Sequence, residues 1–546
     1  KRLRKNLAYK RLFWIFQPDY KKNMREVMQN NLSVNIIGSG LGGLISGAIL
    51  AKHGFKVNVF EARMKIGGYA TSWKRKDYLF DSSLHEFNGF YPDDTKLCMF
   101  RFLDLFEKIK LIKIPSPYTS VFNDLQFTVP HNYKELKAGL IKEFPEDEKG
   151  INQVLDLIER ASFDSNNFMR EKNVVLAYIK TLFKYKTLSK YIFKNTYEVI
   201  WKKIKNPRAR TIIAQLYSYY SDDLKKLNFL FFANPTYSYF MESYWISGTS
   251  STLSETMKGI IEENGGKVYT RKKISKIIFK NKKAVGVVAN GTEEFYSDIT
   301  ICNSPLKYTI ENLIDRKNIP YFARLKAIKT ISSTSLFSIY LGMKIDIKEL
   351  GFTEFCYIIN EKEDLGDIVS NNELIDISLR PIIAVGYNLD DSLTIKGKTV
   401  VNICVSDNMK QWDKLRNNKE EYKREKERAA NSILKRVEAK FPGFIENIEI
   451  MEIGTPITME KYSNNPDGAV YGACQRNSQS TIFRFPNQIK NRNLYFSSAW
   501  VSPGGGISGV MMSAYKTVNL ILKKYKILNK LEDFKKPEYK LNQKLE

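Results

Sequence analysis

Three glycines and one glutamate near the N-terminus have the types and spacing that bind the phosphates and ribose of a dinucleotide. The motif GSGLGG (residues 38–43) follows a short apolar run and precedes small and apolar residues at helical spacing. Gly38 permits a tight turn, Gly40 lets the backbone approach a pyrophosphate, and Gly43 lets the helix pack closely on the strand. Glu61, at the end of the next apolar run, is placed to accept hydrogen bonds from ribose hydroxyls.

The elements that position these residues form one βαβ unit. We expect a strand at Val34–Ile37, a helix over 44–52 that stops at Gly54, and a second strand at Lys56–Phe60. This pattern predicts an α/β fold with a Rossmann-type domain. A glycine-rich turn that only packs a helix is the alternative, and it leaves Glu61 and the pair Gly67-Gly68 unexplained.

A second glycine turn lies near the other end of the chain. A buried-type strand at Leu494–Ser497 is followed by the sequence PGGG (residues 503–506) and then by a helix of small and apolar residues. Helix N-termini attract anionic or electron-rich groups. Two such turns in one chain suit an extended ligand that is held at both ends.

His85 is the candidate for proton transfer, because it is the histidine that stands beside a motif, FDSSLHEFNG (residues 80–89). A structural role, in which His85 hydrogen-bonds a nearby loop, is the favoured alternative. His53 and His131 are interpreted as structural or solvated. The sequence shows no Ser-His-Asp arrangement, phosphate-binding Walker loop or cluster of metal ligands, so no metal is predicted.

The charge of the chain predicts an anionic partner. Over 546 residues the formal net charge is +27, and the hydrophobic content of 43% is ordinary for a globular protein. We favour an anionic membrane surface over nucleic acid, because no nucleic-acid-binding motif is found and the charges mix with large aromatic residues. A coding bias toward solvated lysines is the alternative. No pattern predicts an oligomeric state.

Two basic and aromatic segments are candidates to face lipid. Residues 1–31 are predicted to form a basic amphipathic arm, and an arm that packs back on its own core is equally compatible. The helical region 168–210 is the second candidate, with a solvated helix pair as the alternative. Since no apolar run approaches the roughly 20 residues that span a bilayer, and widely spaced cysteines without a secretory signal indicate a reducing compartment, we expect a cytoplasmic protein that associates peripherally with membranes.

Taken together, these segments resemble the phytoene desaturase, carotenoid isomerase and retinol saturase family of FAD-dependent oxidoreductases, within the amine-oxidase-like flavoproteins. The resemblance covers about residues 33–523. It is carried, in order, by GSGLGGL (38–44), FEARMKIGG (60–68), FDSSLHEFNG (80–89), EFPEDEKGI (143–151), GTSSTLSETM (248–257), CNSP (302–305), GTPITMEKYSNNPDGAVYG (454–472) and SAWVSPGGGISGVMMSA (498–514).

The resemblance implies FAD as the cofactor. It places the adenosine ribose on Glu61, the pyrophosphate on residues 38–43 and near Arg63, the adenine beside Ile274, and the isoalloxazine near residues 67–68 and 504–510. The residues expected at the cofactor are Gly38, Ser39, Gly40, Leu41, Gly42, Gly43, Glu61, Ala62, Arg63, Gly67, Gly68, Tyr69, Ala70, Ile274, Gly504, Gly505, Gly506, Ile507, Ser508 and Val510.

The resemblance also implies a division of the chain and a substrate class. The FAD-binding domain is expected at 32–115, 241–309 and 450–526, an α+β substrate domain with a membrane-facing helical part at 116–240 and 310–449, and a charged tail at 527–546. Members of the family desaturate, saturate or isomerise C–C double bonds of long apolar polyene or isoprenoid lipids, and such a lipid is the expected substrate.

The sequence is also compatible with another cofactor and with another function. NAD is the nearest rival cofactor, since Glu61 would serve it equally, but the pair Gly67-Gly68 and the C-terminal glycine turn favour FAD. A non-enzymatic rival resembles the Rab escort and GDP-dissociation-inhibitor proteins, which share the superfold and carry prenylated clients. The intact glycine motifs at both ends of the chain argue against a carrier.

Overall fold

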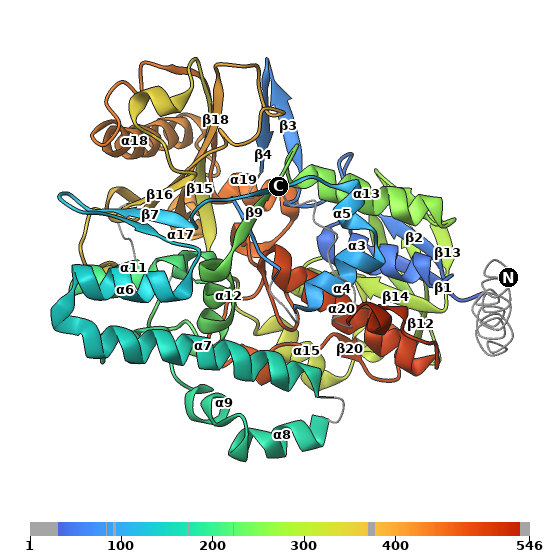
Figure 1. The fold of residues 1–546 in the computed structure, drawn as a ribbon. Coiled ribbons are helices and arrows are strands. Elements are labelled where there is room, and N and C mark those ends of the chain that lie inside the picture. Colours follow the sequence, from blue (N-terminus) through green and yellow to red (C-terminus); the bar gives the residue numbers. More distant parts are fainter. Residues whose placement is uncertain are drawn as a thin grey trace, which may run out of the picture.

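A six-stranded sheet carries the glycine motif. The computed structural model describes residues 31–82, 85–90, 94–171, 174–221, 223–369 and 377–535 (Figure 1). The sheet has the order β10-β2-β1-β14-β21-β20, in which the first five strands are parallel. Its strands are β10 (Lys267–Tyr269), β2 (Lys56–Phe60), β1 (Ser33–Ile37), β14 (Ile299–Cys302), β21 (Leu494–Phe496) and β20 (Gln488–Ile489).

Parallel pairing brings distant parts of the sequence to one edge of this sheet. Strand β1 ends just before Gly38, β2 just before Glu61, and β14 just before Asn303. Because parallel strands place their carboxyl ends at the same edge, these residues lie together, and ligands of α/β proteins bind at that edge. The predicted βαβ unit is therefore confirmed, and β14 and β21 extend it.

Three helices cover the six-stranded sheet. Helix α3 (Leu41–Lys52) is buried from Leu41 to Ala51, and it packs against α13 (Ser250–Glu263) and α20 (Gly506–Lys524) (Figure 1). A helix that is covered on all sides must be apolar all round, as this one is. A Cβ atom on Gly47 would lie 3.0 Å from Ile261 Cδ1, so the small residue permits the close packing of α3.

The second sheet has seven strands and is mostly antiparallel. Its order is β19-β15-β18-β17-β16-β7-β8, and only the β16–β7 pair is parallel. Every residue of β15 and β18 is buried, and the apolar side of α18 (Lys419–Glu438) packs on the sheet. The other strands are β19 (Ile448–Gly454), β17 (Ile382–Gly386), β16 (Cys356–Ile359), β7 (Tyr118–Val121) and β8 (Gln126–Val129), beside β15 (Ser335–Met343) and β18 (Thr399–Asp407).

Small sheets connect these two layers. A hairpin of β3 and β4 leads from the glycine pair toward His85, and a three-stranded sheet β5-β9-β6 follows it. The bounds are β3 (Ser72–Arg75), β4 (Tyr78–Asp81), β5 (Phe87–Asn88), β9 (Ser243–Ile246) and β6 (Leu111–Lys113), with β11 (Ile274–Lys280), β12 (Lys283–Ala289) and β13 (Glu293–Tyr296) in a further sheet.

A helical layer closes the molecule beside the second sheet. Helix α7 packs on α12, and α8 and α9 lie beyond α7 at the lower edge of the view (Figure 1). The helices are α6 (Tyr133–Glu143), α7 (Glu148–Arg170), α8 (Val174–Phe183), α9 (Lys186–Tyr191), α10 (Thr196–Trp201), α11 (Pro207–Ala214) and α12 (Phe229–Met241). The predicted α/β fold class is confirmed.

The structure gives no support for the predicted membrane-facing helical part. Among the residues that the structure describes, no helix combines the length and the apolar character needed to cross a bilayer. The predicted amphipathic arm at 1–31 lies almost entirely outside the described residues, as does the end of the tail from residue 536.

We predict that acid destabilises this fold through its three histidines. Burial lowers the pKa of His53, His85 and His131 to about 4 in each case, from an ordinary value of 6.5. Because the folded state holds them neutral, their stabilisation is full above pH 6.5 and is lost as the pH falls toward 4. For fully buried His85 the shift corresponds to about 3 kcal/mol. Thermal unfolding between pH 7 and 4.5 checks this, since His85→Gln should flatten the slope. An unchanged slope in that variant would contradict the prediction.

Candidate functional site

One large cavity begins at the glycine motif and continues between the two sheets. Its volume is about 2260 Å³, whereas sites for a single drug-sized ligand have about 300–1,000 Å³. Its wall includes Gly38 and Glu61 at the edge of the six-stranded sheet, Tyr340 on β15, and side chains of α7, α9 and α12. The cavity therefore has room for more than one ligand.

The first glycine turn exposes the backbone of a helix N-terminus to this cavity. Gly38 has a φ of +95°, which favours glycine. Gly40 is the N-cap of α3, and the helix has no side-chain cap and no acidic residue in its first turn. The free N–H groups and the positive end of the helix dipole are thus left for an anion. Asn303 Nδ2 donates to the Gly40 carbonyl at 2.8 Å and holds the turn in place.

Glu61 is fixed beside this turn. Its carboxylate accepts hydrogen bonds from Ser39 N at 3.1 Å, Ser39 Oγ at 2.7 Å and Arg63 N at 2.9 Å. An ionised carboxylate has about four acceptor sites, so capacity remains for a ligand hydroxyl. Glu61 lines the cavity, and these hydrogen bonds fix the orientation of its carboxylate.

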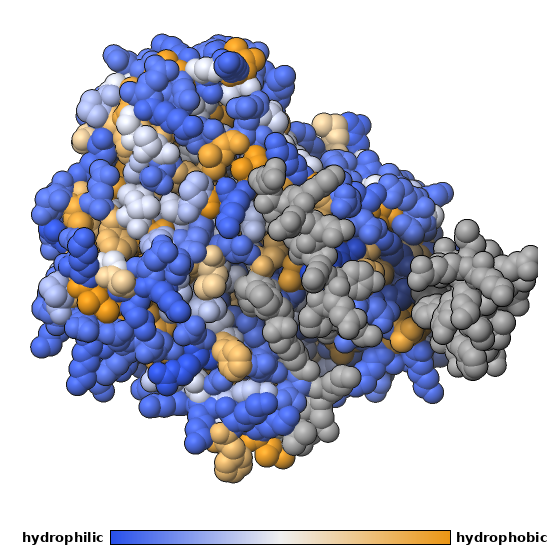
Figure 2. Space-filling view, in the orientation of Figure 1, coloured by the Kyte–Doolittle hydropathy of each residue, from blue (hydrophilic) through white to orange (hydrophobic). Residues whose placement is uncertain are grey.

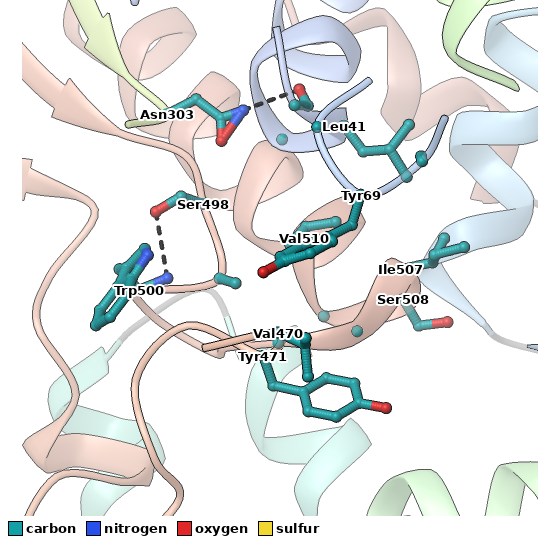
Figure 3. A pocket seen from close by; sticks show the side chains of 18 of the residues that line it. Leu41, Tyr69, Asn303, Val470, Tyr471, Ser498, Trp500, Ile507, Ser508 and Val510 are labelled. Atoms are coloured by element: carbon teal, nitrogen blue, oxygen red, sulfur yellow. Dashed lines mark hydrogen bonds between the residues drawn. The ribbon is translucent and has the colours of Figure 1, made fainter. Parts of the chain in front are cut away.

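The glycine pair at 67–68 lies directly on the first turn. Gly67 N donates to Ser39 O at 2.9 Å, and both glycines have positive φ, +98° and +62°. A Cβ atom on Gly67 would lie 2.0 Å from Ala70 O. Only glycine fits there, and the chain can therefore turn sharply toward Tyr69. Tyr69 lies in the middle of the cavity view, with Leu41 and Asn303 above it and Val470 and Tyr471 below it (Figure 3).

The C-terminal glycine turn presents a second uncapped helix to the same cavity. Gly505 is the N-cap of α20, which again has no side-chain cap and no acidic residue in its first turn. A Cβ atom on Gly505 would lie 2.4 Å from Tyr471 O, whereas one on Gly506 would meet nothing within 4 Å. Ile507, Ser508 and Val510 continue the wall.

The structure brings the predicted cofactor residues together, although three of them stand behind the wall. All of them line the cavity except Ser39, Gly43 and Gly504. Ser39 bonds Glu61, and Cβ atoms on Gly43 and Gly504 would collide with Gly38 O at 2.4 Å and with Gln475 Nε2 at 2.1 Å. These three residues shape the turns and do not face the space between them.

Several lining residues were not predicted. Asn303 follows the carboxyl end of β14, and the rule that parallel strands share an edge would have found it. Ser498 and Trp500 are joined by a hydrogen bond of 3.2 Å from Trp500 N to Ser498 Oγ (Figure 3). The tyrosines of the distal wall read as core residues in the sequence; they are Tyr219, Tyr220, Tyr239, Tyr340 and Tyr471.

His85 also lines the cavity, and burial holds its imidazole neutral at pH 7. It is buried, its Nε2 lies 3.7 Å from Cys404 Sγ, and burial lowers its pKa to about 4 despite a hydrogen bond to Asn402. The neighbouring Glu86 behaves oppositely, because burial raises the pKa of its carboxyl to about 8.

The geometry fits an extended dinucleotide. Two uncapped helix N-termini, those of α3 and α20, face one cavity, and the Glu61 carboxylate lies beside the first. A ligand that reaches both helices must continue past its pyrophosphate into a second, aromatic part, as FAD does. No group of three or more histidine, cysteine or acidic side chains that could hold a metal occurs among the described residues.

Relatives of known sequence support this interpretation. Prolycopene isomerase from Daucus carota is 26% identical over 497 residues, covering 88% of this chain and 78% of the relative. All-trans-retinol 13,14-reductase from Danio rerio is 27% identical over 482 residues, covering 81% and 78%. A 4,4'-diapophytoene desaturase from Methylomonas sp is 23% identical over 516 residues, covering 92% and 97%.

Solved structures share the fold. Putrescine oxidase bound to putrescine matches with a TM-score of 0.61 at 13% identity, covering 90% of this chain and 99% of that one. Cyclohexylamine oxidase from Brevibacterium oxydans matches with a TM-score of 0.58 at 12% identity, covering 91% and 100%.

The family itself is shown by its profile, flavin containing amine oxidoreductase, which matches residues 41–522. The predicted resemblance and the predicted FAD cofactor are thereby confirmed. The chain belongs to the flavin-containing amine oxidoreductase family and is an FAD-dependent oxidoreductase.

Proposed function

We propose that this enzyme desaturates, saturates or isomerises C–C double bonds of a long apolar polyene. The observation that carries the proposal is the length of the cavity, which continues from the glycine turns to Phe168 on α7 and to Leu188 and Ile192 near α9. The names of the relatives specify a lycopene isomer, retinol and diapophytoene, which are all long isoprenoid chains. Such a chain matches a narrow cavity with an apolar and aromatic distal wall.

Within this proposal the chain's own residues bind and orient FAD. Glu61 takes the adenosine ribose, the turn 38–43 and Arg63 take the pyrophosphate, Ile274 meets the adenine, and residues 67–70 and 504–510 surround the isoalloxazine. FAD, when bound, supplies hydride chemistry at its N5. The distal wall excludes water from the polyene, and His85 is a neutral member of that wall.

The same proposal divides the chain between two functions. The cofactor part consists of 32–115, 241–309 and a C-terminal segment up to 526, and the substrate part consists of 116–240 and 310–449. Because β19 pairs with β15 of the seven-stranded sheet, we propose that the cofactor part resumes after Gly454 rather than at 450.

The enzyme takes its substrate from an anionic membrane through α8 and α9. Leu182 and Phe183 on α8 are 62% and 73% exposed, while Thr181 and Leu188 beside them line the cavity. Hydrophobic side chains gather at the lower edge of Figure 2, where α8 lies in Figure 1. Apolar side chains interleaved with lysines suit an anionic interface. We propose a cytoplasmic enzyme that binds this interface peripherally.

A non-catalytic lipid carrier on the same superfold is the competing function, and it is not favoured. The matching family is a family of flavin enzymes. Both uncapped helix N-termini are also intact, and a protein that carried only a lipid would have no use for them.

The proposed reaction is tested with the purified protein and two polyenes. We expect flavin absorption bands in the protein as isolated, and conversion of prolycopene or all-trans-retinol to an isomer, a desaturated or a saturated product that chromatography resolves. The controls are boiled protein and free FAD. A flavin-loaded protein that converts neither polyene would contradict the proposed substrate class.

A substitution at the first glycine turn tests the cofactor placement. In Gly40→Val the side chain would begin 3.0 Å from Asn303 Nδ2 and extend toward the pyrophosphate position, so we expect the bound FAD to fall below about a tenth of the parent level. Gly259→Val is the matched control, because a Cβ atom there meets nothing within 4 Å. Absorbance at the flavin bands, measured per folded protein, gives the result. Full FAD content in Gly40→Val would refute the placement.

Flotation with liposomes tests the membrane surface. We expect binding to phosphatidylserine-containing vesicles, weaker binding as salt rises, and a loss of binding in Leu182→Ser/Phe183→Ser. Ile395→Ser is the matched control, since Ile395 is 53% exposed but lies on another part of the surface. Equal binding to neutral vesicles, or unchanged binding of the double variant, would exclude α8 as an anionic-membrane contact.

A further inference from the structure

Glu86 is a buried acid in the cavity wall that the proposed function has not yet used. Its side chain is only 5% exposed and lines the cavity. It stands on a segment between the two flavin-facing turns. At one end Ser82 Oγ donates to Tyr69 O at 3.0 Å, and at the other the Asn88 amide bonds Ser508 at the start of α20. Residues on either side of Glu86 in the sequence, Ser82 and Asn88, thus bond the two groups of residues that surround the isoalloxazine in the proposal above.

The surroundings of Glu86 hold its carboxyl in the protonated form. Ser243 Oγ donates to Oε2 at 3.3 Å and Tyr219 OH donates to Oε1 at 3.4 Å. Burial raises its pKa to about 8, and these two hydrogen bonds act in the opposite direction. Among the described residues, the groups whose pKa Glu86 affects are neutral at pH 7; they are Tyr118, Tyr219, Tyr220, Tyr239, Tyr471 and Cys356.

A chain of hydrogen bonds joins Glu86 to a half-buried histidine. Ser243 on β9 bonds Glu86 on one side, and its Oγ lies 3.1 Å from His131 Nε2 on the other. His131 follows β8 and is partly exposed to solvent. A hydroxyl can pass a proton by accepting one and donating another. These hydrogen bonds thus lead from the cavity wall to a partly exposed imidazole whose Nδ1 is buried.

We propose that Glu86 is the catalytic acid that protonates a carbon of the bound polyene, and that Ser243 and His131 exchange its proton with solvent. This inference rests on the proposed function, and it gives Glu86 a role in the isomerisation reaction. The Glu86 O–H bond breaks, and a C–H bond forms with the π electrons of one double bond, which leaves a delocalised carbocation. Rotation about a neighbouring bond of lowered bond order follows. The same C–H bond then breaks and returns the proton to the Glu86 carboxylate, so no electrons are gained or lost overall.

The rate of prolycopene isomerisation distinguishes the role of Glu86 from that of its neighbour His85. Glu86→Gln keeps the size of the side chain and removes the acid, so we expect isomerisation to slow by about 100-fold or more, with FAD content unchanged. His85→Gln, in the same segment, should have a smaller effect. A rate for Glu86→Gln within about threefold of the parent, or a larger loss in His85→Gln, would overturn the assignment, because about 100-fold is the lower bound for a general acid.

The pH dependence of the isomerisation rate distinguishes a catalytic role of Glu86 from a purely structural one. The parent rate should fall as the pH rises above about 8, since the acid form is then lost. Tyr219→Phe removes a hydrogen bond that lowers the pKa of Glu86, so the alkaline limb should move to higher pH. An alkaline limb that persists unchanged in Glu86→Gln would also overturn the assignment.

Infrared difference spectroscopy without substrate tests the state of the carboxyl directly. The C=O band of a protonated carboxylic acid should be present at pH 7, vanish through about pH 8 and be absent in Glu86→Gln. Glu263→Gln, on the exposed side of α13, should leave it unchanged. After transfer to D₂O the band should shift as deuterium replaces the carboxyl proton. This exchange should be slower in Ser243→Ala than in the parent. If the band is missing at pH 7, Glu86 is not protonated and the assignment is wrong. If deuterium exchange is equally fast in Ser243→Ala, the proton does not pass through Ser243 and His131.

The failure of this inference can be distinguished from a failure of the proposed function. If the parent isomerises prolycopene and Glu86→Gln does so equally fast, only the role of Glu86 is wrong. If the parent converts no polyene, the acid role falls with the proposed function, whatever the infrared band shows.

Discussion

Close approach of backbone to backbone at the glycine turns is the constraint on which the rest of this structure depends. Gly42 would place a Cβ atom 2.4 Å from Ser497 O, and Gly505 would place one 2.4 Å from Tyr471 O. Each contact joins segments that are remote in sequence, and each leaves a helix N-terminus facing the cavity. The glycines therefore do more than permit turns, because they allow the two halves of the cofactor site to be built against one another.

Desolvation controls the chemistry that the cavity wall can perform. The same burial that keeps His85 neutral keeps Glu86 protonated, since desolvation disfavours the charged form of each group. The pKa values of two adjacent residues therefore shift in opposite directions, because burial lowers the pKa of the imidazole and raises that of the carboxyl. A wall of tyrosines and apolar residues sets this outcome and also accommodates an apolar ligand.

The glycine turns can be predicted from local signals in the sequence, and the structure brings most of their residues to one cavity. The spacing of Gly38, Gly40 and Gly43 before a helix, with Glu61 after the next strand, specifies the βαβ turn without reference to the remaining chain. Spacing does not tell which atoms of a turn face the ligand, and so Ser39, Gly43 and Gly504 lie behind the wall.

The substrate side could not be predicted in the same way. Glu86, Tyr219 and Ser243 come from three distant segments, and no motif in the sequence links them. Glu86 and Ser243 meet because β5 pairs with β9 in the three-stranded sheet, where Asn88 pairs with Ser243. Tyr219 reaches them from the 3-10 turn that follows α11. No period of two or of 3.6 residues encodes such non-local pairings.

The order of strands in the first sheet also has a consequence for biosynthesis. Val34 of β1 pairs with Ile299 of β14, and Thr300 of β14 pairs with Leu494 of β21. The ribosome releases the N-terminal glycine turn early, but the helix that completes the site begins only at Gly506. Contacts this remote in sequence are slow to form, and unpaired strands attract other chains in the meantime. The strands β1 and β2 are therefore synthesised long before β14 and β21, which continue the sheet beside them.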